Sequence, residues 1–369
     1  MSDDQSASGR YDISLSDTGI RARLAVIGAI ILAIAGAFAY VAGWFSPTLL
    51  TQARVIDRFE QVDGVYPGFR RNHAKGVCIR GTFESNGQGE RLSRSALFRP
   101  GSVPVIGRFS LGGGHPQMPD GPMAVLAMAL SFRPVGGEEW RTAMIDLPIF
   151  IVKDVQGFYD QLLASKPDPA TGQPDPAKMA AFGAAHPEFV RAMQVIKSHP
   201  SPSGFADASY NSLNAFRFVN SVGVVRAVRW SMAASEPFAP ATAEQGTSSD
   251  KNYLFDNVIA RLTRGPVQWH LIVTIGQPGD VTNDPTMAWP SDRERVDVGT
   301  LTINRAESEA PGNCRDLVFD PLILPWGIEP SDDPMLSARS ASYAESFRRR
   351  EGERKTPSEI QVPANHKGS

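Results

Sequence analysis

The chain has 369 residues, of which 42% are hydrophobic and 21% charged, an ordinary composition for a globular protein that buries a sizeable core. Its formal net charge of -2 and the lack of an RNA- or DNA-binding motif argue against a nucleic-acid partner. Its two cysteines, Cys78 and Cys314, are too few to hold a metal cluster. We expect two unpaired, packed thiols, with a disulfide as the alternative in an oxidising compartment.

The N-terminal part contains an uncharged apolar stretch over residues 24–45. At about 1.5 Å per residue this stretch is long enough to cross a bilayer core of about 30 Å. Arg21 and Arg23 precede it, which predicts that residues 1–23 form a polar cytoplasmic segment. We therefore expect a membrane-anchored protein whose main domain lies on the extracytoplasmic, periplasmic side. Ala37-Phe38-Ala39 resembles a cleavage site, so a removed signal peptide is the alternative.

The residues from 51 to 350 show the pattern of an antiparallel β-barrel with surrounding helices, an α+β fold. Apolar alternation and β-branched residues predict strands at residues 103–111, 125–132, 144–152, 214–232, 267–275 and 296–303. Helical spacing of apolar residues predicts helices at 155–163 and 251–262. Proline- and glycine-rich loops are predicted at 166–176, 198–204 and 237–247. The charged tail, residues 351–369, is predicted to be disordered.

Arg339 and Tyr343 stand one turn apart in a helix predicted to begin at Asp333 and Pro334, an N-cap followed by proline. Side chains at i and i+4 share one helix face, so Arg339 can hydrogen-bond the phenol oxygen and stabilise it as an anion. A phenolate of this kind is an iron ligand, which makes the pair a candidate side of a haem pocket. Taken alone, it could equally be a surface tyrosine beside a helix-stabilising arginine.

Several motifs, read in order and spacing, resemble those of the haem catalases. They lie at residues 70–76, 81–84, 108–110, 148–154, 319–321, 327–329 and 334–343. The resemblance covers about residues 60–350 and is greatest to the short catalase-related peroxidases, which keep the haem barrel but lack the long arm and C-terminal helical domain of full-length catalases. It implies a catalase-like barrel that binds haem b.

The resemblance also implies roles on the two sides of the haem. His73 would be the distal histidine, a general acid–base that moves the peroxide proton, and Ser110 would orient its ring. Asp146 stands where we expect the asparagine that donates a hydrogen bond to peroxide. Since an ionised carboxylate accepts but cannot donate, we expect Asp146 to weaken disproportionation to oxygen.

The remaining roles concern haem binding. Arg70 and Arg108 match arginines that bind the haem propionates, because a planar guanidinium pairs with a carboxylate through two hydrogen bonds. Phe158 matches a ring that packs over the porphyrin. Tyr343, assisted by Arg339, would be the proximal iron ligand.

Together these features predict a haem peroxidase that reduces hydrogen peroxide or organic hydroperoxides with an organic electron donor, with possible residual catalase activity. One alternative is a hydroperoxide isomerase on the same barrel. Another is a non-enzymatic haem-binding protein, although that function would not need His73 or Ser110. A barrel that binds a lipid and no metal is a third alternative. The sequence is compatible with an oligomer and does not identify the physiological reductant.

Overall fold

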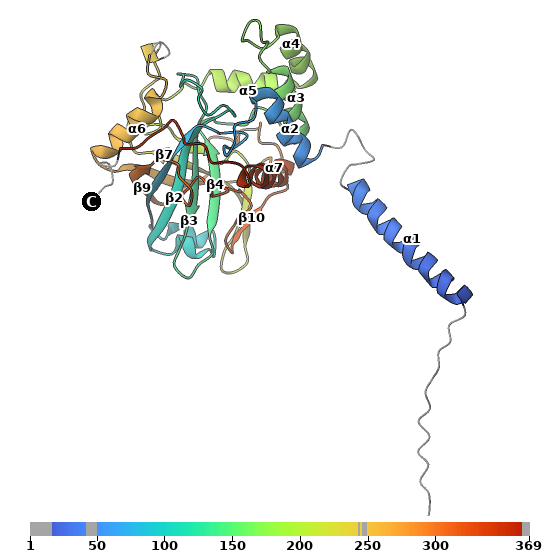
Figure 1. Cartoon of the computed structure of the whole chain (residues 1–369). Helices are drawn as coiled ribbons and strands as arrows, with labels where there is room; N and C mark the ends of the chain where they lie inside the picture. The colour runs from blue at the N-terminus through green and yellow to red at the C-terminus, as the bar shows by residue number, and fades with distance from the viewer. Residues whose placement is uncertain (1–16, 42–49, 243, 246–248, 364–369) are drawn as a thin grey trace, which may run out of the picture. The chain divides into compact units, whose positions relative to one another are not determined.

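The computed structural model describes residues 17–41, 50–242, 244–245 and 249–363 (Figure 1). The chain divides into two compact units, residues 1–51 and 52–369. The α-helices are α1 (Asp17–Val41), α2 (Gln52–Asp63), α3 (Val155–Ala164), α4 (Pro176–Ala185), α5 (Pro187–Lys197), α6 (Tyr253–Thr263) and α7 (Pro334–Glu351). The strands are β1 (Gly76–Ser85), β2 (Gly101–Leu111), β3 (Leu126–Phe132), β4 (Trp140–Ile145), β5 (Tyr210–Asn211), β6 (Phe216–Val219), β7 (Val225–Ala234), β8 (Val267–Ile275), β9 (Arg295–Glu307) and β10 (Ile328–Pro330).

The described part of the first unit consists of helix α1 and residues 50–51. Residues 18–41 of this helix are long and apolar enough to cross a membrane, a property that signal sequences near an N-terminus share. The helix begins at Asp17, so residues 17–23 of the expected polar segment are helical. The predicted end at residue 45 lies outside the described residues.

The second unit is built on a closed antiparallel barrel, which confirms the predicted fold. Within the described residues, eight strands follow each other around the ring in the order β7, β5, β4, β3, β2, β1, β9 and β8, and pairing of β7 with β8 closes it. Strands β6 and β10 extend the sheet beyond β7. Helices α2, α3, α4 and α5 gather at one end of the barrel, whereas α6 lies on another side (Figure 1).

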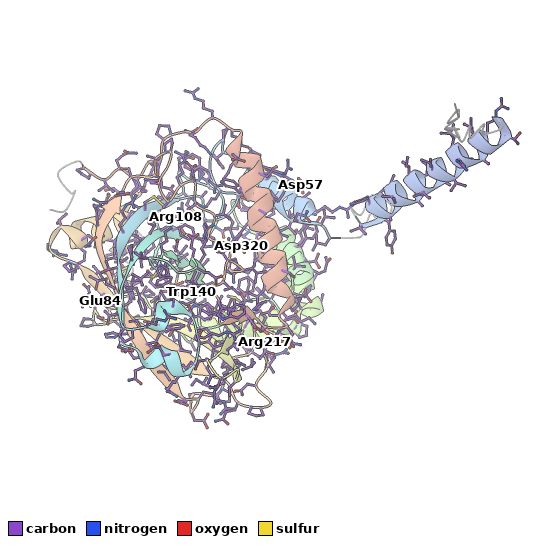
Figure 2. All side chains as sticks on the ribbon, turned by 90° about the horizontal axis from the view of Figure 1, so that it is seen from below. Asp57, Glu84, Arg108, Trp140, Arg217 and Asp320 are labelled. Carbon is purple, nitrogen blue, oxygen red and sulfur yellow. A yellow bond between two sulfur atoms is a disulfide. The ribbon has the colours of Figure 1, made fainter. Side chains whose placement is uncertain are left out.

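Aromatic side chains fill the barrel interior. The ring of Trp140 stacks on Phe132 at 5.0 Å between centroids and meets Trp230 edge-on at 4.9 Å. Such ring pairs contribute about 0.5–1.5 kcal/mol each beyond the burial of their area. Trp140 lies inside the ring of strands, while the exposed Glu84 lies at its edge (Figure 2). Along β4 and β8, buried side chains alternate with less buried ones on the outer face of the barrel.

Two predicted strands were misplaced. Residues 214–232, expected as one segment, form the hairpin of β6 and β7, with a turn at Asn220 to Gly223 in which the Gly223 N–H bonds the Asn220 carbonyl. Strand β4 ends at Ile145, so most of the predicted segment 144–152 is not a strand. Pro148 cannot donate to a sheet ladder, which explains the early end. Strand β1 was not predicted.

Two further predictions were wrong. Cys78 and Cys314 form a disulfide. Pairing of β1 with β9 places Cys78 opposite Glu307, and the segment that follows β9 brings Cys314, seven residues after Glu307, next to Cys78. Residues 352–363 are not disordered: Ile360 belongs to the barrel's hydrophobic core, and the Thr356 carbonyl accepts a hydrogen bond from Arg315 at 2.5 Å. Residues 364–369 of the predicted tail lie outside the described residues.

Candidate active site

A cavity of about 550 Å³ lies between the barrel and helices α2, α3 and α7. It brings together seven of the eight predicted site residues, which come from distant parts of the chain: Arg70, His73, Arg108, Ser110, Phe158, Arg339 and Tyr343. A volume of this size is typical of sites for small molecules and cofactors.

His73 sits in an unusual backbone conformation at the cavity wall. Its φ of 54° is one that side-chain-bearing residues rarely adopt. The Asn72 side-chain oxygen holds this turn by accepting from the His73 and Gly113 N–H groups, each at 2.9 Å, and Arg108 Nη1 donates to the His73 carbonyl at 2.8 Å. Left-handed conformations of this kind persist only where the surroundings fix them, and they concentrate at functional sites.

The electrostatics of the cavity keep the His73 imidazole neutral. Burial, followed by the positive charges of Arg108, Arg339 and Arg70, lowers the pKa of His73 from 6.5 to about 3. Ser110 Oγ lies 3.5 Å from His73 Nδ1, at the outer limit of a hydrogen bond. The predicted Ser110–His73 contact is therefore present but long, and it leaves Nε2 as the ring nitrogen for a reacting molecule.

Tyr343 lies at the end of a hydrogen-bond chain that begins at the cap of α7. Arg339 Nη2 donates to the Tyr343 phenol oxygen at 3.4 Å, and Arg339 Nη1 donates to Asn214 Oδ1. The Asn214 amide in turn donates to Asp333 Oδ2 at 2.7 Å. Asp333 also caps α7, since its other oxygen accepts the Met335 N–H at 2.9 Å. The predicted Arg339–Tyr343 contact and the predicted N-cap are both confirmed, and the structure adds Asn214 as the link between them.

The two arginines predicted to bind propionates share a buried carboxylate. Glu309 Oε1 lies 2.7 Å from Arg108 Nε and 3.2 Å from Arg70 Nη1. Arg108 is only 2% exposed and reaches this place because Gly76 has no side chain: a Cβ there would lie 2.4 Å from Arg108 Cζ. Although burial raises it, the charges of Arg108 and Arg70 hold the pKa of Glu309 below its usual value.

Arg350 is a further cationic residue of the cavity that the sequence reading missed. It is 2% exposed, lines the cavity and donates to the Arg315 carbonyl at 2.7 Å. Burial and the nearby Arg108 lower the pKa of Arg350 to about 10. Arg350 lies in α7 two turns after Tyr343, so helix periodicity could have predicted that it shares a helix face with Tyr343.

Of the predicted site residues Phe158 and Asp146, only Phe158 lines the cavity. Phe158 lines the cavity and packs against Phe59 and Phe150, with ring centroids 5.7 and 5.8 Å apart. Asp146 is not among the lining residues, whereas its neighbour Ile145 is. The Asp146 carboxylate instead accepts the Leu126 N–H at 3.0 Å. The role of Asp146 towards peroxide therefore stays a prediction, without a contact to the cavity.

Comparisons with known proteins agree with this fold and site. The catalase family model matches residues 38–367. The chain is 39% identical to a catalase-related peroxidase of Synechococcus elongatus, over 83% of this chain and 90% of that protein, and 33% identical to one of Mycolicibacterium paratuberculosis, over 82% and 96%. A fungal catalase structure shares the fold with a TM-score of 0.69 and 21% identity; the match covers 83% of this chain and 64% of the solved one.

The closed barrel and its phenol–guanidinium pair, taken with these relatives, place the protein among the haem oxidoreductases. The matched region extends over most of the sequence, from the end of α1 to the C-terminal tail. The chain belongs to the catalase family.

The residues of the cavity fit a haem group. A phenol oxygen that accepts from a guanidinium suits a ferric iron ligand, and the guanidinium groups of Arg70, Arg108 and Arg350 suit carboxylates. Ala129 and Ala143 are paired neighbours on β3 and β4, and both line the cavity. Such short side chains leave a flat apolar wall, as a planar macrocycle requires.

Proposed function

We propose that the protein is a peroxidase that binds haem b through Tyr343 and reduces hydrogen peroxide or an organic hydroperoxide with an organic electron donor. The observation that carries this proposal is that Tyr343, with Arg339 at its oxygen, shares one cavity with the neutral His73. The short relatives support the peroxidase assignment over a full-length catalase. This chain covers 90% and 96% of the two catalase-related peroxidases, but 62% of a Pseudomonas syringae catalase that is 26% identical.

The chain's own residues supply the acid–base part of the reaction. Bound haem supplies the redox-active iron. His73 Nε2, neutral at physiological pH, takes the proton from one peroxide oxygen and returns it to the other as the O–O bond breaks. Overall, an organic hydroperoxide takes two hydrogens from the donor and gives an alcohol, one water and the oxidised donor. Hydrogen peroxide gives two waters and the oxidised donor. Residual catalase activity would use a second peroxide as that donor.

The site residues have corresponding roles in this proposal. Ser110 holds the His73 ring through Nδ1, which leaves Nε2 as the nitrogen that acts on peroxide. Arg70 and Arg108, with Arg350, bind the haem carboxylates, and Phe158 packs against the ring. Arg339 donates a hydrogen bond to the Tyr343 oxygen and so orients it as the iron ligand.

An absorption spectrum of the haem-loaded, full-length protein tests this function. The parent protein should show a Soret band that changes on addition of peroxide. Tyr343→Phe removes the iron ligand, so the band should be lost or displaced. His73→Ala should keep the band but lose about 10²–10⁴-fold in the rate of the peroxide-induced change, the usual contribution of a general acid–base.

Tyr159→Phe is the matched control. Tyr159 is also paired with an arginine, Arg58, but does not line the cavity. Its spectrum should equal that of the parent. An unchanged spectrum for Tyr343→Phe would refute the proposed ligand. Oxidation of a phenolic donor, measured beside oxygen release, separates peroxidase from catalase turnover.

We also propose that α1 anchors the protein in a membrane and that the second unit lies on the extracytoplasmic, periplasmic side. The apolar length of α1 supports the anchor, and Arg21 and Arg23 near its start support this orientation. The Cys78–Cys314 disulfide supports an oxidising compartment. Protease added outside intact spheroplasts should digest the second unit. Protection of that unit until the membrane is broken would contradict the orientation.

A further inference from the structure

Glu309 is a buried acid that the proposed reaction does not use. It is 6% exposed and does not line the cavity. Its carboxylate instead pairs with the guanidinium groups of Arg108 and Arg70, at 2.7 and 3.2 Å, outside the cavity lining. The two arginines therefore stand between an internal carboxylate and the cavity that they line.

The surroundings of Glu309 carry an excess of positive charge. Four arginines interact with one another or with Glu309 in this region: Arg70, Arg108, Arg315 and Arg350. Each is at least largely buried, and buried cations without partners destabilise a fold strongly. Asp316 also interacts with Arg350, so without a cofactor these four cations face two carboxylates. The two propionates of bound haem b would bring the negative charges to four.

We propose that Glu309 is an internal counter-ion that stabilises the cofactor-free pocket and, by the same contacts, weakens the grip of Arg70 and Arg108 on the cofactor carboxylates. The inference rests on the proposed function, since it assumes a cofactor with carboxylates at these arginines. It goes further in giving this acid a role in setting cofactor affinity, and it predicts that the domain folds before the cofactor binds.

Two opposite effects would follow from loss of the Glu309 charge. The arginines could lose their orientation, which would weaken cofactor binding. Alternatively, removal of a competing negative charge would strengthen it, because two carboxylates on one guanidinium repel each other and share its charge. The direction depends on what else holds the arginines in place.

Backbone carbonyls hold both arginines independently of Glu309. Arg108 donates to the carbonyls of His73 and Ala74, at 2.8 and 3.0 Å. Arg70 donates to those of Cys314 and Leu317, at 2.9 and 3.0 Å, and the disulfide fixes that loop to β1. Orientation should therefore survive the loss of Glu309, and the Coulomb effect should decide the outcome.

The test is a titration of the cofactor-free, full-length protein in detergent with ferric protoporphyrin IX, followed by its Soret band. Glu309→Gln should bind this haem about tenfold more tightly than the parent, which corresponds to loss of one repulsive charge near the site. The cofactor-free variant should melt about 5 °C lower than the parent, and haem should restore most of that difference.

Two controls separate this role from general stability. Glu307→Gln removes a half-buried acid at the end of β9, two residues before Glu309, and should leave haem affinity unchanged. Glu307 pairs with Arg80 and Arg305 and does not line the cavity. Haem dimethyl ester, whose carboxylates are blocked, should bind the parent and Glu309→Gln equally. Glu309→Asp, with a shorter charged arm, should fold even if Glu309→Gln does not, and should bind haem more tightly than the parent by a smaller factor.

Each result decides the matter. Equal or weaker haem binding by Glu309→Gln, or by Glu309→Asp if only that variant folds, would overturn the inference and leave the proposed function intact. Equal tightening for the ester would also overturn it, because the effect would not act through the cofactor carboxylates. Failure of the parent protein to bind haem at all would overturn the proposed function and, with it, this inference.

Discussion

His73 combines two features that each reduce the stability of the folded protein. One is its left-handed backbone conformation. The other is a folded-state pKa of about 3, against 6.5 for the free side chain. Because the folded pKa is depressed, the unfolded chain takes up the proton first, and stability falls as the pH drops from 6.5 towards 3. A purely structural histidine would not require this backbone conformation or a neutral ring. A proton carrier requires an imidazole that is both neutral and held in one orientation.

Asp146 allows a test of buried charge that is separate from catalysis. Burial raises the pKa of Asp146 from 3.8 to about 7. Because the folded pKa is raised, the protonated carboxyl group contributes to the stability of the folded protein. This contribution is fully present below pH 3.8 and is lost as the pH rises through 7. Asp146→Asn keeps an oxygen for the Leu126 N–H and cannot ionise. We expect its stability relative to the parent to increase by about 2 kcal/mol between pH 4 and pH 8.

Urea unfolding of the two proteins at these pH values measures the difference. Asp168→Asn, a change of an exposed loop carboxylate, is the control and should show no such trend. A stability difference that stays constant from pH 4 to pH 8 would show that burial does not raise the pKa of Asp146 in the folded protein.

Helix α7 connects local helix chemistry with the iron-binding side of the cavity. Asp333 caps the helix through the Met335 N–H and holds the Asn214 amide that contacts Arg339. Loss of an N-cap alone costs about 1 kcal/mol. Asp333→Ala removes the cap and also leaves the buried Asn214 amide without this partner. We therefore expect a loss of about 2–3 kcal/mol in the free energy of unfolding, together with a displaced Soret band in the haem-loaded protein.

Asp175 provides the matched cap for comparison. It caps α4 by accepting the Ala177 N–H at 2.9 Å; its side chain is 41% exposed and does not line the cavity. Asp175→Ala should therefore lose about 1 kcal/mol or less, with the Soret band unchanged. Equal stability losses for the two variants would mean that the contact between Asp333 and Asn214 contributes nothing beyond the cap.

The success of the sequence predictions also differs between elements. Strand β8 was predicted at its observed bounds, because buried and less buried residues alternate along its whole length. Strands β2 and β3 were predicted within two residues, although nearly all residues of β3 are buried. The pattern failed where apolar residues continue beyond the end of a strand, as at residues 149–152 after Ile145. It also failed across the turn between β6 and β7, where apolar residues on both sides hide the hairpin.

At the scale of the whole molecule, the predicted site assembled because its motifs carry distinctive residues in a fixed order. The features that the sequence did not predict arise from contacts between residues far apart in the chain. Glu309 and the disulfide follow no local pattern: Glu309 meets Arg108 across 201 residues, and the two cysteines are separated by 236. Sequence spacing alone cannot show that such residues meet, because only the closed barrel brings β1 and β9 together.

The disulfide should be a main source of stability for the second unit. A cross-link over so long a loop restricts the unfolded chain and contributes about 3–5 kcal/mol to the free energy of unfolding. We expect the variant with both Cys78→Ala and Cys314→Ala to lose this amount in urea unfolding of the full-length, oxidised protein. Alanine avoids placing a hydroxyl in two fully buried positions.

The single variants distinguish the cross-link from the packing of the two sulfur atoms. Breaking the bond requires only one substitution, so Cys78→Ala alone should lose nearly the whole amount, and adding Cys314→Ala should cost less than about 1 kcal/mol more. Two equal and additive losses would instead assign the stability to packing of each side chain. Because the loop that carries Cys314 also supplies carbonyl acceptors to Arg70, the cross-linked protein should retain haem longer than either single variant during transfer to an excess of apomyoglobin.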